Sequence, residues 1–238
     1  MVSRTVFVTG GTSGIGAAIS QSFAQLGDQV IAIGATAEEI ESASSRPGFA
    51  TIVCEVLDVR DSQAVAQRLK SIGPIDVLVN CAGVIRRQAE HDPEVFSDVI
   101  DINLNGTMRV CAAARSGLKA RSGNIINVAS MLSFFGGGLV PAYSASKGGI
   151  AQLTKSLAIA YAGDGIRVNA VAPGWIATPL TKSLQDDPQR SAQILARTPL
   201  GRWGTPEDLT GPVLFLAGPT AQFVTGVILP VDGGYLIS

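Results

Sequence analysis

The stretch at residues 9–16 is TGGTSGIG, and it follows directly on the apolar run at residues 5–8. Its glycines, Gly10, Gly14 and Gly16, have the spacing GxxxGxG, and apolar residues at helical spacing follow as far as Leu26. Glycine lets a backbone turn tightly and approach a phosphate closely, and a helix N-terminus offers free N–H groups to an anion. A glycine-rich turn without a ligand is the alternative. The position at the first strand-to-helix junction favours a strand–loop–helix unit that binds a dinucleotide.

Short β-branched runs alternate with longer amphipathic segments along the rest of the chain. Strands are predicted at residues 5–8, 30–33, 51–56, 76–79, 124–128, 167–171 and 227–231. Helices are predicted at residues 15–26, 61–72, 93–119, 141–162, 188–196 and 206–217. This alternation indicates an α/β fold with a parallel sheet and helices on both faces. Because no repeat or low-complexity linker divides the chain, we expect one doubly wound, Rossmann-type domain over residues 1–238, with a seven-stranded parallel sheet.

The composition argues against several classes of function. The 238 residues carry a net charge of −1, which lacks the basic excess of nucleic-acid-binding domains. No apolar run approaches the roughly 20 residues of a membrane span, and the N-terminus has no signal-peptide pattern. We therefore expect a cytoplasmic protein that binds neither nucleic acid nor a membrane. With a single histidine, His91, and three widely spaced cysteines, we expect no metal site.

A second stretch, AYSASKGG at residues 142–149, places Tyr143 four residues before Lys147 in a predicted helix. Residues at i and i+4 share one helix face, and an ammonium group beside a phenol favours the phenolate. We therefore expect the pKa of Tyr143 to lie below its usual value of about 10, so that it exchanges protons near neutral pH. Ser130, at the end of a predicted strand, can hydrogen-bond the reacting oxygen. Asn103, a poor helix former inside a predicted helix, is expected to hold a water next to Lys147.

Two further turns at the carboxyl ends of predicted strands suit a dinucleotide. Asp58 follows the third strand, where it can accept a hydrogen bond from the adenine amino group. Gly83 follows the fourth strand and lets the backbone pass close to the adenosine ribose. Both turns therefore extend the predicted cofactor site along one edge of the sheet.

The chain carries five motifs in this order: TGGTSGIG, NCAG at 80–83, INLNG at 102–106, a serine thirteen residues before YxxxK, and APGWIAT at 172–178. Together they resemble the motifs of the short-chain dehydrogenase/reductase family. The resemblance covers essentially the whole chain. It implies hydride transfer between a nicotinamide cofactor and a carbonyl/alcohol pair, in a family that usually forms homotetramers. It also implies that Tyr143 is the general acid/base, that Lys147 binds the nicotinamide ribose and lowers the Tyr143 pKa, and that Ser130 orients the substrate oxygen. Asn103 would support the proton relay.

The same resemblance implies a cofactor-binding set spread over the turns that follow the strands. It comprises Gly10, Thr12, Ser13, Gly14, Ile15, Gly16, Gly34, Ala35, Thr36, Asp58, Val59, Asn80, Ala82, Gly83, Tyr143, Lys147, Pro173, Gly174, Ile176 and Thr178. In this set, Pro173 and Gly174 would face the nicotinamide, with Thr178 near its carboxamide.

The end of the second predicted strand bears on the choice between NAD and NADP. An acidic residue there binds a ribose 2′-hydroxyl in NAD enzymes, and an arginine is common in NADP members of the family. Here the strand ends in Gly34-Ala35-Thr36, which has neither. These residues leave room for a 2′-phosphate, with Thr36 as a donor, so we expect NAD(P) with a slight preference for NADP. Glu38 and Glu39 are interpreted as solvated residues at a helix start.

Residues 82–87, 129–147 and 190–212 resemble the sugar-acid branch of the family, notably the 2-dehydro-3-deoxy-D-gluconate 5-dehydrogenases, with the gluconate 5-dehydrogenases more distant. Arg86 and Arg87 follow the NCAG turn, where an arginine can bind a substrate carboxylate bidentately. Two solvated loop arginines are the alternative. Trp175 lies at the start of a predicted lid, at about residues 175–205, and can line the substrate pocket.

Other functions stay open at this point. A 3-oxoacyl-(acyl carrier protein) reductase would need a basic surface, which the predicted helix ending near residue 119 could supply. An apolar ketone could contact the aromatic residues at 134–135. A nucleotide-sensing protein that kept the fold and lost the chemistry is disfavoured, because the full set of Asn103, Ser130, Tyr143 and Lys147 is present.

Overall fold

All seven strands of the sheet are parallel, in the order β3-β2-β1-β4-β5-β6-β7, in a computed structural model that describes residues 3–238. The strands are β1 Thr5–Thr9, β2 Gln29–Gly34, β3 Val53–Val56, β4 Val77–Asn80, β5 Asn124–Val128, β6 Arg167–Pro173 and β7 Ile228–Val231. The chain runs outward from β1 to β3, returns to β4 on the other side of β1, and continues to the far edge. Ligands of open α/β sheets bind at such a reversal, outside the carboxyl ends of the strands. The predicted seven-stranded parallel sheet is confirmed.

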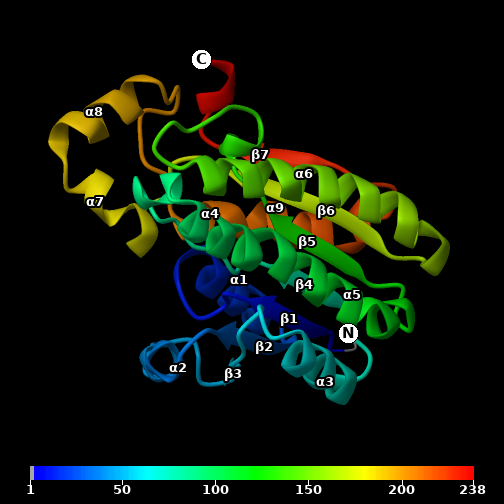
Figure 1. The fold of residues 1–238 in the computed structure, drawn as a ribbon. Coiled ribbons are helices and arrows are strands. Elements are labelled where there is room, and N and C mark those ends of the chain that lie inside the picture. Colours follow the sequence, from blue (N-terminus) through cyan, green and yellow to red (C-terminus); the bar gives the residue numbers. More distant parts are fainter. Residues whose placement is uncertain (1–2) are drawn as a thin grey trace.

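Helices cover both faces of this sheet (Figure 1). They are α1 Gly14–Gln25, α2 Ala37–Ser44, α3 Ser62–Ile72, α4 Pro93–Ile100, α5 Gly106–Lys119, α6 Pro141–Tyr161, α7 Lys182–Gln185, α8 Pro188–Ala196 and α9 Thr210–Ala217. One face carries α3, α5 and α6, and the other carries α1 and α9. Figure 1 shows α7 and α8 standing away from the sheet, at the end where the strands finish. Within residues 3–238, no helix has the length and apolar character needed to cross a membrane.

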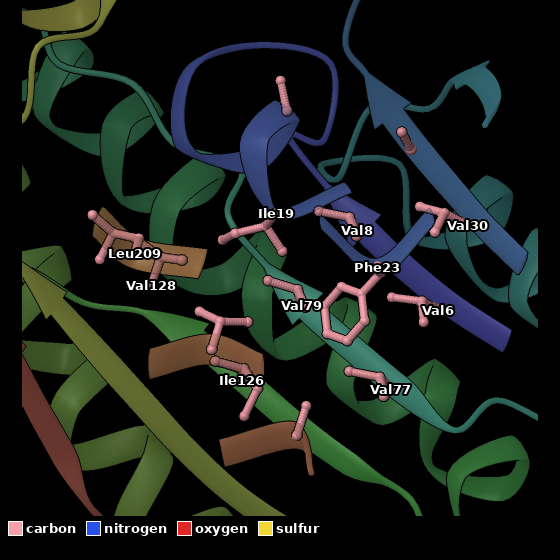
Figure 2. Close-up of a cluster of buried hydrophobic side chains, with 14 of the residues drawn as sticks. Val6, Val8, Ile19, Phe23, Val30, Val77, Val79, Ile126, Val128 and Leu209 are labelled. Carbon is pink, nitrogen blue, oxygen red and sulfur yellow. The ribbon is translucent and has the colours of Figure 1, made fainter. Parts of the chain in front are cut away.

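The alternation of side chains along β1 explains why both faces are covered. Val6 and Val8 belong to one buried apolar cluster and Phe7 to the other. All three are fully buried, which is typical of a central strand in a parallel sheet. Figure 2 shows the ring of Phe23, from α1, lying over the strands that carry Val6 and Val77. The result is a rigid central sheet whose strand ends can hold functional groups in fixed positions.

Three predicted elements differ from the observed ones. The helix predicted over residues 93–119 is interrupted by a π-helical turn at Asp101–Asn105, which separates α4 from α5. The strand predicted at residues 51–56 begins only at Val53, because the Ile52 N–H donates back to the Phe49 carbonyl oxygen at 3.0 Å and not to the neighbouring strand. The helix predicted at residues 206–217 begins with a 3₁₀ turn, Pro206–Leu209, ahead of α9. In each case the apolar spacing continues across the break, so the pattern alone does not reveal it.

Candidate active site

A pocket of about 600 Å³ runs along the carboxyl edge of the sheet. All residues predicted for the catalytic, cofactor and substrate sites line this pocket, except Gly16, Thr36, Asn80, Arg86 and Asn103. Elements far apart in the sequence thus converge on one cavity, from the loop after β1 to the segment that leads into α7. Among residues 3–238, no group of three or more His, Cys, Asp and Glu side chains is arranged to hold a metal ion.

The loop between β1 and α1 has the shape that a pyrophosphate requires. Gly10 and Gly14 have φ angles of +62° and +48°, in the left-handed region that favours glycine. A Cβ on Gly16 would lie 2.0 Å from the Gly10 carbonyl oxygen, so Gly16 serves close packing of helix on loop and does not line the pocket. The N-cap residue Ser13 makes no side-chain capping bond, which leaves the first N–H groups of α1 for an anion. The buried Thr12 hydroxyl also has no partner among the described residues, so the loop fits a dinucleotide.

The end of β2 holds a carboxylate that comes from the following helix. Glu39 Oε2 accepts a hydrogen bond from the Ala35 N–H at 2.7 Å and lies 3.0 Å from the position of a Cβ on Gly34. Glu39 is exposed, as predicted, but it also lines the pocket. Thr36 instead caps α2 through its side chain, which accepts from the Glu39 N–H at 3.3 Å. Sequence reasoning missed the reach of Glu39 because the contact depends on how α2 starts.

Ser130, Tyr143 and Lys147 lie together in the wall of the pocket. Ser130 follows β5 in an extended conformation and is only 7% exposed. Lys147, in the second turn of α6, donates a hydrogen bond from Nζ to the Val128 carbonyl oxygen at 2.6 Å. Its Nζ also lies 5.5 Å from the centre of the Tyr143 ring. The i, i+4 spacing therefore places both side chains on one helix face, as expected.

The electrostatics of this group differ from the prediction. Burial raises the pKa of Tyr143 to about 12, although a hydrogen bond with Ser130 acts in the opposite direction. Burial likewise lowers the pKa of Lys147 to about 8. The predicted depression of the Tyr143 pKa is therefore wrong for this structure, because loss of water around the phenol outweighs the hydrogen bond with Ser130.

Two buried asparagines support the site from behind the pocket. Asn103, in the π-helical turn, accepts from the Val84 N–H at 2.8 Å and donates to the Val84 carbonyl oxygen at 3.0 Å. It also donates to Ser146 Oγ at 3.2 Å, so it links the loop after β4 to α6. Asn80 donates to Asn127 Oδ1 at 2.9 Å, between the ends of β4 and β5. The contacts of Asn103 occupy its side chain, so this residue positions the backbone of the loop after β4. Asn80 Oδ1, in contrast, has no hydrogen-bond partner among the described residues.

The two adjacent arginines after β4 have different surroundings. Arg87 is half-buried and lines the pocket, whereas the Arg86 side chain is exposed and does not. Burial lowers the pKa of Arg87, with a further contribution from the positive charge of Arg190. The ion pairs found among residues 3–238 do not include Arg87. Sequence reasoning named both residues for a carboxylate and could not tell which one faces inward.

Trp175 borders the same pocket from the segment after β6. Its ring packs edge-on against Trp203 and Tyr235, at centroid distances of 6.0 and 6.2 Å. Its indole N–H is buried and has no hydrogen-bond partner among the described residues. The first residue of the predicted lid therefore lines the pocket and belongs to an aromatic cluster.

Comparisons with known proteins match dehydrogenases and reductases along nearly the whole chain. The family model described as enoyl-(acyl carrier protein) reductase matches residues 10–236. A 2-dehydro-3-deoxy-D-gluconate 5-dehydrogenase from Pseudoalteromonas atlantica is 42% identical over 243 residues, which cover 98% of this chain and 96% of that protein. A 3-oxoacyl-(acyl carrier protein) reductase from Thermotoga maritima is 38% identical over 248 residues, with 98% of each chain covered. The crystal structure of a gluconate 5-dehydrogenase from Burkholderia cenocepacia, in complex with NADP and tartrate, superimposes with a TM-score of 0.92 at 32% identity, over 99% of this chain and 96% of that chain.

Proposed function

The chain belongs to the short-chain dehydrogenase/reductase family of NAD(P)-dependent oxidoreductases, and we propose that its substrate is a sugar acid or keto-sugar acid. The reaction would interconvert a secondary alcohol and a ketone. The observation that carries the proposal is that Arg87 lines the same pocket as Ser130, Tyr143 and Lys147. A cation that can bind a carboxylate thus shares a cavity with groups that can move a proton to or from a carbonyl oxygen.

The chain's own residues would handle the proton while the nicotinamide cofactor supplies the hydride donor or acceptor. In reduction, the Tyr143 phenol donates its proton to the substrate oxygen, and in oxidation the phenolate takes the proton from the alcohol. The Ser130 hydroxyl would hydrogen-bond the same oxygen and hold it next to Tyr143. The Lys147 ammonium would stabilise the phenolate, because opposite charges attract strongly in a buried site.

The residues around the pocket suggest how the cofactor is held. The uncapped N-terminus of α1 and the loop glycines would bind the pyrophosphate. Glu39 and Asp58 line the pocket and would face the adenosine, and Thr178 lies close to Gly14 on the side of α7. We further propose that residues of about 175–205 form a lid over the bound cofactor and substrate.

Arg87 would bind the carboxylate of the substrate. A guanidinium binds a carboxylate through two parallel hydrogen bonds, and partial burial strengthens such a pair. Arg60, another pocket arginine, is already paired with Asp58 at 2.7 Å and Asp98 at 2.9 Å. Arg87 is therefore the better candidate of the two for an anionic substrate.

A 3-oxoacyl thioester is the second candidate substrate, because Met131, Leu132 and Phe135 give part of the pocket an apolar lining. The surface expected to dock an acidic carrier protein argues against it. Arg115 and Lys119 of α5 both pair with Asp164, at 2.6 and 2.8 Å. Asp164 thus compensates one of these two positive charges, which makes the helix surface less basic than its sequence indicates.

We also propose a cytoplasmic homotetramer. Exposed apolar side chains support assembly, among them Phe215, Phe223 and Ile237. The three cysteines are free thiols, as is usual in a reducing compartment.

The test is nicotinamide absorbance with purified protein, offering NAD(H) and NADP(H) in turn. The substrates are 2-dehydro-3-deoxygluconate and its 5-keto product, a 3-oxoacyl thioester and an uncharged ketone. We expect turnover of the sugar acids to exceed that of the other two in kcat/KM. Preference for the thioester or the uncharged ketone would overturn the substrate proposal and leave the hydride chemistry in place.

A further inference from the structure

One buried carboxylate beside the pocket has no part in the chemistry proposed above. Glu90 lies in a 3₁₀ turn, Ala89–His91, and only 1% of its surface is exposed. A buried carboxylate is costly unless hydrogen bonds satisfy it. Here Oε2 accepts from the backbone N–H of Tyr143 and Oε1 from that of Arg86, each at 2.8 Å. Glu90 thus joins the proposed acid/base to the loop that carries Arg87.

The contact with Tyr143 supplies a cap that α6 otherwise lacks. The N-cap residue, Val140, has no side-chain acceptor for the free N–H groups of the first turn. Pro141 has no N–H, and Tyr143 is the third residue of the helix. A carboxylate at this place also interacts favourably with the positive end of the helix dipole. Glu90 therefore fixes the turn of α6 from which the Tyr143 side chain extends.

The contact with Arg86 ties Glu90 to the loop after β4. The Glu90 N–H donates back to the Arg86 carbonyl oxygen at 3.0 Å, so the two residues bind each other through both backbone and side chain. The Gln88 N–H donates to the Leu139 carbonyl oxygen at 2.8 Å, which pins the same loop to the segment before α6. The loop that contains Arg87 is thus held to the start of α6 on two sides.

We propose that Glu90 is a positioning residue that holds Tyr143 and Arg87 in fixed relative positions. The proton donor and the substrate carboxylate site then stay at a fixed separation. The proposal rests on the acid/base role assigned to Tyr143. It also assigns the Glu90 charge a second effect, on the proton affinity of the phenol.

Several groups act on the Tyr143 phenol besides burial, which raises its pKa most. Ser130, after β5, lowers the pKa, whereas the charge of Glu90, and that of Cys81 after β4 once its thiol ionises, raise it. Lys147 faces the ring from the same helix, and Arg87 is the cation that interacts with Glu90. Removing the Glu90 charge should therefore lower the pKa of Tyr143. Oxidation, which needs the phenolate, would then extend to lower pH.

The test compares Glu90→Gln with Glu94→Gln, an exposed carboxylate in the first turn of α4. The amide of Glu90→Gln has one oxygen for two N–H donors, so one contact is lost. We expect faster hydrogen exchange of the Tyr143 or Arg86 amide, and a fall in kcat on the order of 10- to 100-fold, as expected for a small misplacement. The acid limb of the oxidation profile should move to lower pH. The pH profile is measured with whichever of the substrates named above the wild-type protein turns over.

Glu90→Asp separates position from charge. The shorter side chain keeps the charge but cannot reach both N–H groups, so we expect lower kcat with the acid limb unmoved. The inference would be overturned if Glu90→Gln and Glu94→Gln had the same rates of amide exchange, the same kcat and the same acid limb of the oxidation profile. A fall in kcat with an unmoved limb in both Glu90 variants would overturn the charge effect. Failure of the substrate proposal would show differently, as poor turnover of sugar acids by the wild-type protein, and amide exchange tests Glu90 without any substrate.

Discussion

Lys147 holds its ammonium group between the Val128 carbonyl oxygen, 2.6 Å away, and the ring of Tyr143, whose centre lies 5.5 Å away. Only 4% of Lys147 is exposed, so the charge has little water around it. Burial accordingly lowers the pKa of Lys147 to about 8 and raises that of Tyr143 to about 12. In this structure both side chains are thus driven towards their neutral forms.

The buried lysine should make the free energy of unfolding depend on pH. Because the pKa of Lys147 falls from 10.5 to about 8 on folding, the unfolded chain binds the proton more tightly between these values. Stability therefore rises as the pH increases through this window. Tyr143 has the opposite effect above about pH 10, where the unfolded phenol loses its proton first. We expect urea unfolding of the wild-type protein to show a rise in the free energy of unfolding between about pH 8 and pH 10 that Lys147→Met lacks. Lys155→Met, which changes an exposed lysine of the same helix, should keep the rise, and an equal rise in all three proteins would contradict the prediction.

Removal of the Tyr143 hydroxyl should stop proton transfer and spare cofactor binding. Tyr143→Phe keeps the ring and loses only the donor, so we expect kcat to fall by about 10²- to 10⁴-fold, the usual contribution of general acid–base catalysis. The dissociation constant of the reduced cofactor, measured by nicotinamide fluorescence, should change little. Tyr161→Phe, on a buried residue at the far end of α6, serves as the control. Wild-type turnover by Tyr143→Phe would rule out the proposed role.

The parts of the fold that depend on repeating patterns could be predicted, and those that depend on single contacts could not. The parallel sheet follows from the alternation of β-branched runs and amphipathic segments, and the loop at Gly10 follows from glycine spacing. The π-helical turn around Asn103 is invisible in the same pattern, because its apolar residues continue the helical spacing. The sign of the Tyr143 pKa shift was wrong because motif spacing reveals the charged neighbour but not the depth of burial. Glu90 was missed for a similar reason, since its two partners are four and fifty-three residues away.

The carboxylate of Glu39 should limit the preference for NADP that is expected from the small residues at positions 34–36, because it repels a 2′-phosphate. Glu39 Oε2 lies at the end of β2, beside Gly34 and bonded to Ala35, where the adenosine ribose is expected. Glu39→Gln removes the repulsion and keeps the size, so we expect the ratio of kcat/KM for NADP to that for NAD to rise about tenfold, or ~1.4 kcal/mol. Glu38→Gln neutralises the neighbouring exposed carboxylate and should leave the ratio near its wild-type value. Equal ratios in the two variants would show that Glu39 does not contact the ribose.

Arg87 and Arg86 offer a matched pair for testing the substrate class. Arg87 lines the pocket, whereas Arg86 directs only its backbone N–H inward, to Glu90. A charged hydrogen-bonding pair contributes about 1.5–3 kcal/mol, so Arg87→Ala should raise KM for a keto-sugar acid roughly 10- to 100-fold. The same variant should hardly change KM for an uncharged ketone, because that substrate has no carboxylate to bind. Arg86→Ala should leave KM for both substrates near the wild-type value. The Arg86 side chain is exposed, so the substitution removes only a distant charge that solvent screens. Equal effects of the two substitutions, or an equal effect of Arg87→Ala on both substrates, would place the carboxylate elsewhere in the pocket.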